Sequence, residues 1–223
     1  MIRIDDLLGK VSSYIPDPAT VGQVSKAYVY SATLHRNDFT STGASTLQHA
    51  LEVSSILADL KLDARCVVAG LVHDALEHSL AQPEALRQAI GEDAAHLVEE
   101  VSRLSRATFR GSEAARAQHM REMILASTRD LRVILLLLAD RLQVLRSPQQ
   151  LDPETQKALA RETLAIYAPI AHRLGIHYFK AELEDRAFEI LEPAGFAELQ
   201  AAVQGRLRQS QGMLDRVNPE LQA

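Results

Sequence analysis

Two histidines, an aspartate and a glutamate lie close together in the stretch LVHDALEHSL, at positions 71–80. On a helix, His73 and Glu77 would be about one turn apart, and so would Asp74 and His78. All four ionisable side chains would then share one face. Such a face can bind a metal ion and activate water, or it can be the solvated polar stripe of an amphipathic helix. The stretch alone leaves both interpretations open.

A carboxylate that follows a long apolar run gives a second indication of metal chemistry. Asp140 comes directly after LRVILLLLA, which is apolar on every side and predicts a helix that is buried all round. An ionised carboxylate in such a helix costs folding free energy unless it is paired or binds a metal. The alternative to a metal is a buried ion pair with Arg141 or another arginine.

His49 would complete a mixed set of nitrogen and oxygen ligands, although a lone histidine early in a helix is often a core or cap residue. The candidate metal ligands are His49, His73, Asp74 and Asp140. Such a set suits manganese, iron, zinc or magnesium and lacks the thiolates of a structural zinc site. A six-coordinate ion would keep positions for water and a phosphate oxygen, where it would lower the pKa of the water and neutralise developing phosphoryl charge.

The elements that must position these side chains are predicted to be helices. Aromatic residues make up only 4% of the sequence, and apolar residues recur at helical spacing between short breakers. The predicted helices cover residues 44–60, 64–79, 83–90, 92–107, 112–126, 131–146, 153–175, 178–191 and 196–216. Residues 35–46 are predicted to form a polar loop. The expected fold is all-α, a compact bundle of about 9–11 helices.

Composition excludes several classes of protein. A chain of 223 residues that is 47% hydrophobic suits one sizeable globular domain, with or without a small appendage. A net charge of −5 argues against a nucleic-acid partner. The single cysteine, Cys66, fits a reducing compartment. The N-terminus lacks a signal-peptide pattern, and the apolar run 133–139 is too short to cross a membrane. We therefore expect a cytoplasmic protein without a membrane partner.

Four segments resemble the hydrolase domain of the RelA/SpoT alarmone enzymes, which belongs to the HD superfamily of metal-dependent phosphohydrolases. The order His, His-Asp, Asp is that of the superfamily. The segments are VAGLVHDALEHS, AAHLVEEVSRLSR, ILASTRDLRVILLLLADRLQVLRS and ETLAIYAPIAHRLGIHYFKAELEDRAFEIL. The last resembles the hinge that follows the hydrolase core, and together the matches span residues 25–191.

The resemblance implies a hydrolase that uses Mn²⁺, or another divalent metal, to remove the 3′-pyrophosphate from (p)ppGpp or a related nucleotide. It implies the same four metal ligands and gives Glu77 the role of the catalytic glutamate. The hydrolase domain would cover residues 1–177, with residues 178–223 packed on it. Longer family members continue into a synthetase domain, so we expect no alarmone synthesis here. A stand-alone chain, a cropped longer protein and a homo-oligomer all stay open.

The catalytic and nucleotide-binding positions depart from the family pattern. His78 stands where the family has an aspartate, and a histidine can act as general base near neutral pH. Thr40 replaces an arginine that packs on the guanine base, whereas Thr42 keeps the local chemistry. Arg141 and Ser147 keep a cation and a hydroxyl in the last metal-binding helix.

Two cations flank the polar loop that leads to His49, and we expect both to face the substrate. The candidate substrate-binding residues are thus Lys26, Arg36, Thr40, Thr42, Arg141 and Ser147. Losing a base-stacking cation costs roughly 0.5–2 kcal/mol, enough to alter substrate choice without touching the phosphate chemistry. The alternative is a catalytically weak nucleotide-binding or regulatory module on the same fold.

Overall fold

Capping residues set the bounds of several helices. The computed structural model describes residues 2–36, 45–105, 117–118, 120–122, 124 and 130–206. The side chain of Asp130 accepts a hydrogen bond from the N–H of Arg132, and Asp152 accepts one from the N–H of Thr155. These bonds satisfy first-turn amides that have no partner within a helix. Both aspartates therefore begin helices where the sequence predicts them.

Helices account for most of the described residues, and no β-strand occurs among them, which confirms the all-α prediction. The helices are α1 (Ile4–Tyr14), α2 (Pro18–Leu34), α3 (Thr46–Asp59), α4 (Ala64–Gly70), α5 (Pro83–Ile90), α6 (Glu92–Ser105), α8 (Leu131–Arg146), the 3₁₀ helix η1 (Pro148–Gln150), α9 (Pro153–Glu162), the π-helix η2 (Thr163–Tyr167), α10 (Ala168–Arg173) and α11 (His177–Leu191). A further helix covers residues 193–206. None of the described helices has the length and hydropathy that crossing a membrane requires.

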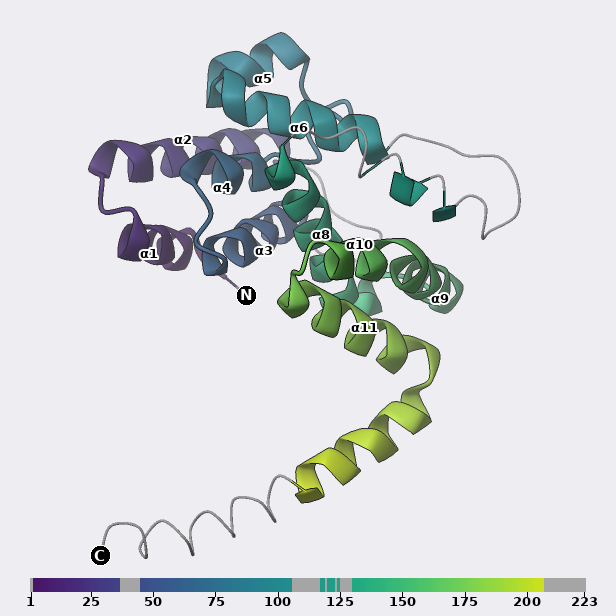
Figure 1. Cartoon of the computed structure of the whole chain (residues 1–223). Coiled ribbons are helices and arrows are strands. Elements are labelled where there is room, and N and C mark those ends of the chain that lie inside the picture. Colours follow the sequence, from purple (N-terminus) through teal and green to yellow (C-terminus); the bar gives the residue numbers. More distant parts are fainter. Residues whose placement is uncertain are drawn as a thin grey trace, which may run out of the picture.

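Helix α8 lies at the centre of the bundle, where it contacts α3, α4, α6 and α11 (Figure 1). Leu136, Leu138 and Leu142 are almost completely buried, as the apolar run predicts. Burial of a leucine side chain contributes about 1.5–3 kcal/mol. The packing of α3, α4 and α6 around α8 therefore fixes the positions of the side chains that these elements carry.

The helix predicted over residues 64–79 is wrong in its second half, because α4 ends at Gly70 and residues 71–79 form successive turns. Nδ1 of His73 donates a hydrogen bond to the carbonyl of Gly70, at 2.9 Å. An α-helix would use that carbonyl to accept the N–H of Asp74. The left-handed φ of +58° at Ser79 closes the segment. The polar residues of this stretch thus lie on a turn and not on one helical face.

The last described helix, residues 193–206, extends away from the body of the molecule (Figure 1). The ring of Phe196 meets that of Phe188 edge to face, with 5.7 Å between their centres, at the junction with α11. The sequence predicts a helix over residues 196–216, so its start lies three residues too late, and its end lies outside the described residues.

Candidate metal centre

Two imidazoles and a carboxylate converge where α3, α8 and the turn after α4 meet. Nε2 of His49 lies 3.1 Å from Oδ1 of Asp140 and 3.2 Å from Nε2 of His73. Nε2 of His73 lies 3.4 Å from the same oxygen of Asp140. Each side chain can offer one ligand atom, and these atoms lie within 4.8 Å of one another, so a single ion could contact all three.

Hydrogen bonds on the far side of both rings favour the tautomer that binds metal through Nε2. Nδ1 of His73 donates to the carbonyl of Gly70, and Nδ1 of His49 donates to Oε1 of Gln143. Carbonyl oxygens only accept hydrogen bonds, so in the neutral rings the proton stays on Nδ1 and the Nε2 lone pair faces the cluster. Metal-binding histidines are held in this way in most proteins. The three residues therefore fit a metal.

The cluster is strongly coupled electrostatically. Burial opposes a positive charge on His73, but the hydrogen bond to Asp140 and its negative charge prevail and raise the pKa of His73 to about 9. Burial would likewise raise the pKa of Asp140, but hydrogen bonds from His49 and His73 hold it well below its usual value. A proton on His73 and a divalent cation would therefore compete for the same place.

Asp74, the fourth predicted ligand, faces a histidine that the sequence does not single out. Oδ1 of Asp74 lies 3.2 Å from Nε2 of His35, and both side chains are almost completely buried. Burial acts to raise the pKa of Asp74, but the hydrogen bond with His35 and the charge of His73 lower it. Asp74 borders the same cavity as the other three residues but is not part of their cluster. Its role as a ligand stays a prediction.

A cavity of about 620 Å³ opens over the cluster. Its described walls are formed by Thr46, His49, His73, Asp74, Glu77, His78, Leu80, Val101, Ser105, Asp140, Gln143, Val144, Ser147, Gln150 and Leu151. None of these lining residues is a lysine or an arginine. Three of the predicted catalytic and substrate-binding residues border this cavity, namely Glu77, His78 and Ser147. Glu77 and His78 lie on the exposed side of the turn, and Ser147 directly follows α8.

The guanidinium of Arg141 forms its hydrogen bonds with residues other than Asp140. Its guanidinium donates hydrogen bonds to Glu162, at 3.0 Å, and to the hydroxyl of Tyr167, at 2.8 Å. It also lies 4.1 Å from the centre of the Tyr167 ring. Arg141 borders a smaller cavity of about 190 Å³, whose walls include Glu77 and Asp140. The predicted alternative for Asp140, an ion pair with Arg141, is not what the structure shows.

The other predicted substrate-binding residues are not brought together. Lys26 borders a separate cavity of about 370 Å³, together with Arg65 and Gly91. Arg36 is exposed in the turn after α2. Thr40 and Thr42 lie outside the described residues.

Sequence reasoning misses His35, Glu52 and Gln143. The sequence places His35 in the polar loop, but this residue directly follows α2 and is buried. Gln143 follows Asp140 by three residues, and Glu52 follows His49 by three. That spacing places each beside its neighbour on one helix face and could have indicated a supporting role.

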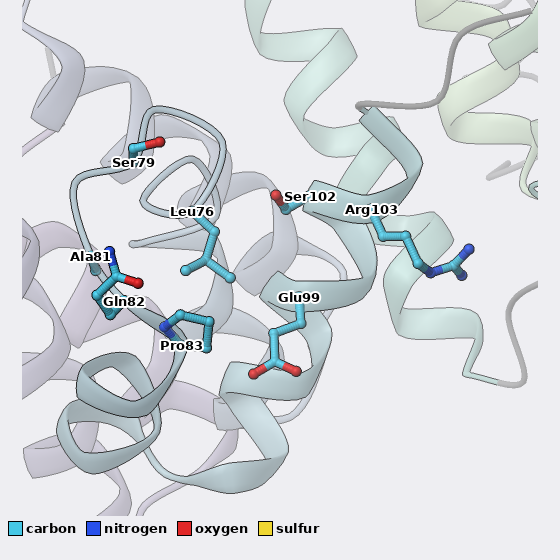
Figure 2. Close-up of a pocket in the computed structure, with 8 residues that line it drawn as sticks. All are labelled: Leu76, Ser79, Ala81, Gln82, Pro83, Glu99, Ser102 and Arg103. Atoms are coloured by element: carbon cyan, nitrogen blue, oxygen red, sulfur yellow. The ribbon is translucent and has the colours of Figure 1, made fainter.

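The turn that carries Glu77 and His78 also borders a second cavity, of about 490 Å³ (Figure 2). Leu76 and Ser79 lie on the side of the turn that faces this cavity, opposite the end of α6. Arg103 of α6 pairs with Glu100, at 2.7 Å. One short turn therefore separates the two cavities, and α6 contributes residues to both.

The chain is similar to known proteins in sequence and in fold. Residues 27–177 match the family model described as HD domain. The chain is 42% identical over 208 residues to the GTP pyrophosphokinase of Myxococcus xanthus. The aligned region covers 92% of this chain and 27% of that protein. It is 35% identical over 222 residues to the bifunctional (p)ppGpp synthase/hydrolase SpoT of Escherichia coli (strain K12), covering 100% of this chain and 32% of that protein. The chain thus spans under a third of the length of these relatives.

A solved structure of a metazoan ortholog of SpoT has a similar fold. That protein is described as one that hydrolyzes ppGpp and plays a role in starvation responses. It matches with a TM-score of 0.51 at 21% sequence identity, covering 78% of this chain and 96% of that one. At this identity the likeness shows the arrangement of the helices alone.

Proposed function

The chain belongs to the HD domain family, and we propose that it is a metal-dependent phosphohydrolase that removes the 3′-pyrophosphate from guanosine tetra- or pentaphosphate or from a related nucleotide. The observation that carries the proposal is the convergence of His49, His73 and Asp140 within 3.4 Å of one another. The choice of substrate is supported by the E. coli relative, which is named a (p)ppGpp synthase/hydrolase. A buried free thiol, Cys66, supports a reducing compartment such as the cytoplasm.

A divalent cation, Mn²⁺ in our proposal, would be held by Nε2 of both histidines and by the carboxylates of Asp140 and Asp74. Mixed imidazole and carboxylate sets suit manganese, iron, zinc and magnesium. When bound, the ion supplies positive charge that polarises a phosphate group and acidifies water. His35 would orient the Asp74 carboxylate through the 3.2 Å contact between them.

In the proposed reaction, a water oxygen attacks the phosphorus that is bonded to O3′ of the ribose. The bond between that phosphorus and O3′ breaks, which gives pyrophosphate and a nucleotide with a free 3′-hydroxyl. Glu77 and His78 border the cavity from the exposed side of the turn. We assign them to accept the proton of the attacking water and to return a proton to the departing O3′.

The cavity walls suit a substrate whose charge is met by the metal. Asp74, Glu77 and Asp140 line the cavity, and no described lining residue is a lysine or arginine. These carboxylates repel a phosphate unless a cation lies between them. The hydroxyls of Thr46, Ser105 and Ser147 could donate hydrogen bonds to phosphate or sugar oxygens.

Product analysis tests the proposal. The pure protein is incubated with Mn²⁺ and ppGpp, and the products are separated by anion-exchange chromatography, in parallel with Asp74→Ala. The parent should release GDP and pyrophosphate, and the variant should be at least about 100-fold slower. Asp59→Asn is a matched control, because Asp59 is an exposed partner of Lys10 at the end of α3.

If metal binds but ppGpp stays intact, the site serves another phosphate ester. If neither metal binding nor hydrolysis is found, the chain is a binding or regulatory module on this fold.

A further inference from the structure

A chain of hydrogen bonds leads from the far side of His49 to a carboxylate one turn along the same helix. Nδ1 of His49 donates to Oε1 of Gln143, and Nε2 of Gln143 donates to Oε2 of Glu52, at 2.7 Å. The second oxygen of Glu52 accepts from Nε2 of Gln48, also at 2.7 Å. Gln143 belongs to α8 and is only 3% exposed, whereas the other three belong to α3. These hydrogen bonds therefore form a partly buried connection between the two helices.

Glu52 sets the direction in which these hydrogen bonds run. A carboxylate only accepts hydrogen bonds, so the NH₂ group of Gln143 must face Glu52 and its carbonyl oxygen must face His49. Without that acceptor the Gln143 amide could turn over, because its oxygen and nitrogen ends have nearly the same shape.

A turned amide would change the chemistry of His49. Its NH₂ group would face Nδ1, which accepts a hydrogen bond only when the ring proton lies on Nε2. Nε2 would then carry a hydrogen and would have no lone pair for a metal ion. The orientation of one buried amide thus decides whether the ring can act as a ligand.

We propose that Glu52 acts through Gln143 as a positioning residue, which fixes the tautomer of His49 and keeps the cluster ready to bind a divalent cation. Glu52 is not among the described residues that line the cavity over the cluster. The part of the inference that concerns the cation rests on the proposed function, whereas the tautomer of His49 is a property of the metal-free protein. Outer partners of metal-binding histidines change metal affinity by about 10- to 100-fold when they are replaced.

The test measures the tautomer and the metal affinity separately. In metal-free, ¹⁵N-labelled protein at alkaline pH, long-range ¹H–¹⁵N correlation distinguishes a protonated from an unprotonated ring nitrogen. We expect His49 of the parent to carry its proton on Nδ1. Glu52→Met, which removes the acceptor, should give a mixture of both tautomers. Calorimetric titration with Mn²⁺ should show an affinity at least about 10-fold weaker for this variant.

Gln48→Met is the matched control. It removes the other hydrogen bond of Glu52 on the same helix but leaves the acceptor that faces Gln143. If Glu52 had only a structural role, Gln48→Met and Glu52→Met should have similar effects on the tautomer of His49 and on the Mn²⁺ affinity. The proposed role predicts that Gln48→Met keeps the tautomer of the parent.

The inference is overturned if His49 of the parent carries its proton on Nε2, a result that needs no variant to fold. It is also overturned if Glu52→Met keeps the parent's tautomer and metal affinity. If the tautomers behave as expected but the parent binds no ion, Glu52 still fixes the tautomer of His49, whereas the part of the inference that concerns the cation is overturned together with the proposed hydrolase.

Discussion

The imidazole of His73 lies buried beside a carboxylate, and this makes the stability of the metal-free protein depend on pH. Its pKa is raised from 6.5 to about 9, because Asp140 outweighs the effect of burial. A group whose pKa is higher in the folded state stabilises the fold fully below its unfolded-state pKa. That contribution is lost as the pH rises through the folded-state pKa.

We therefore predict that the metal-free protein loses up to about 3 kcal/mol of unfolding free energy as the pH rises from 6.5 to above 9. Urea denaturation in the presence of EDTA at a series of pH values measures this loss. His73→Gln, which cannot titrate in this range, should show a smaller loss. Equal pH profiles for the parent and His73→Gln would contradict the prediction.

The shared oxygen of Asp140 is the second feature that matters at the scale of single residues. Asp140→Asn keeps the shape of the side chain but removes the charge that both imidazoles face. We predict that Mn²⁺ binding becomes at least about 100-fold weaker and that the pKa of His73 falls. Calorimetry gives the affinity, and NMR titration of the imidazole gives the pKa. An unchanged affinity would exclude Asp140 as a ligand.

At the scale of elements, the close approach of α3 and α4 depends on Gly70. A Cβ atom at this position would lie 2.8 Å from Cδ1 of Leu57 and 2.8 Å from Oγ of Ser54. It would also lie 3.2 Å from the Cα of Ser54, so a shift of side chains alone would not make enough room. The two helices carry His49 and the carbonyl that holds His73, so their spacing sets the geometry of the cluster.

We predict that Gly70→Ala lowers the unfolding free energy by about 1–3 kcal/mol and weakens metal binding. Urea denaturation and Mn²⁺ titration measure the two effects. Gly22→Ala is the control, because a Cβ at Gly22 in α2 meets no atom within 4 Å. That variant should be about 0.5–1 kcal/mol more stable than the parent. A similar effect of both substitutions would show that the spacing of α3 and α4 does not matter.

Helix α5 could be predicted closely from the sequence because it has local signals at both ends. Pro83 in the first turn and Gly91 after the last, which has a φ of +86°, bound α5 as expected. The segment 71–79 could not be predicted in this way, because hydrophobic periodicity does not show that a histidine side chain will take a carbonyl from the helix. The polar residues of the candidate site could thus be found from the sequence, but the backbone that presents them could not.

The supporting residues of the site are harder to predict for a different reason. Spacing shows which face of a helix a residue shares, but not what that face meets in the fold. Gln143 and Glu52 are 91 residues apart in the sequence, and His35 meets Asp74 across 39 residues. Such pairs follow from the packing of the helices. The predicted roles of Thr40 and Thr42 stay predictions.

At the scale of the whole molecule, an acidic protein is proposed to bind a highly anionic nucleotide. The net charge is −5, and the described cavity walls carry three of the carboxylates but no lysine or arginine. We predict that Glu77→Gln, which keeps the proposed metal ligands but lacks a proposed proton-transfer group, binds ppGpp in Mn²⁺ and binds it at least about 10-fold more weakly when EDTA removes the metal. Equilibrium dialysis with this variant measures the affinities without turnover. Guanosine, which has no phosphate, is the control and should show no such dependence, and equal ppGpp binding with and without metal would contradict the prediction.

The pairing of Glu52 with Gln143 also constrains how this protein can evolve. Replacing Glu52 alone would leave the Gln143 amide free to turn over, and replacing Gln143 alone would leave a half-buried carboxylate without its partner from α8. A substitution at only one of the two positions therefore gives a less fit intermediate sequence, whereas substituting both together need not. Among descendants of one ancestral chain, positions 52 and 143 should therefore be substituted together, in correlated pairs.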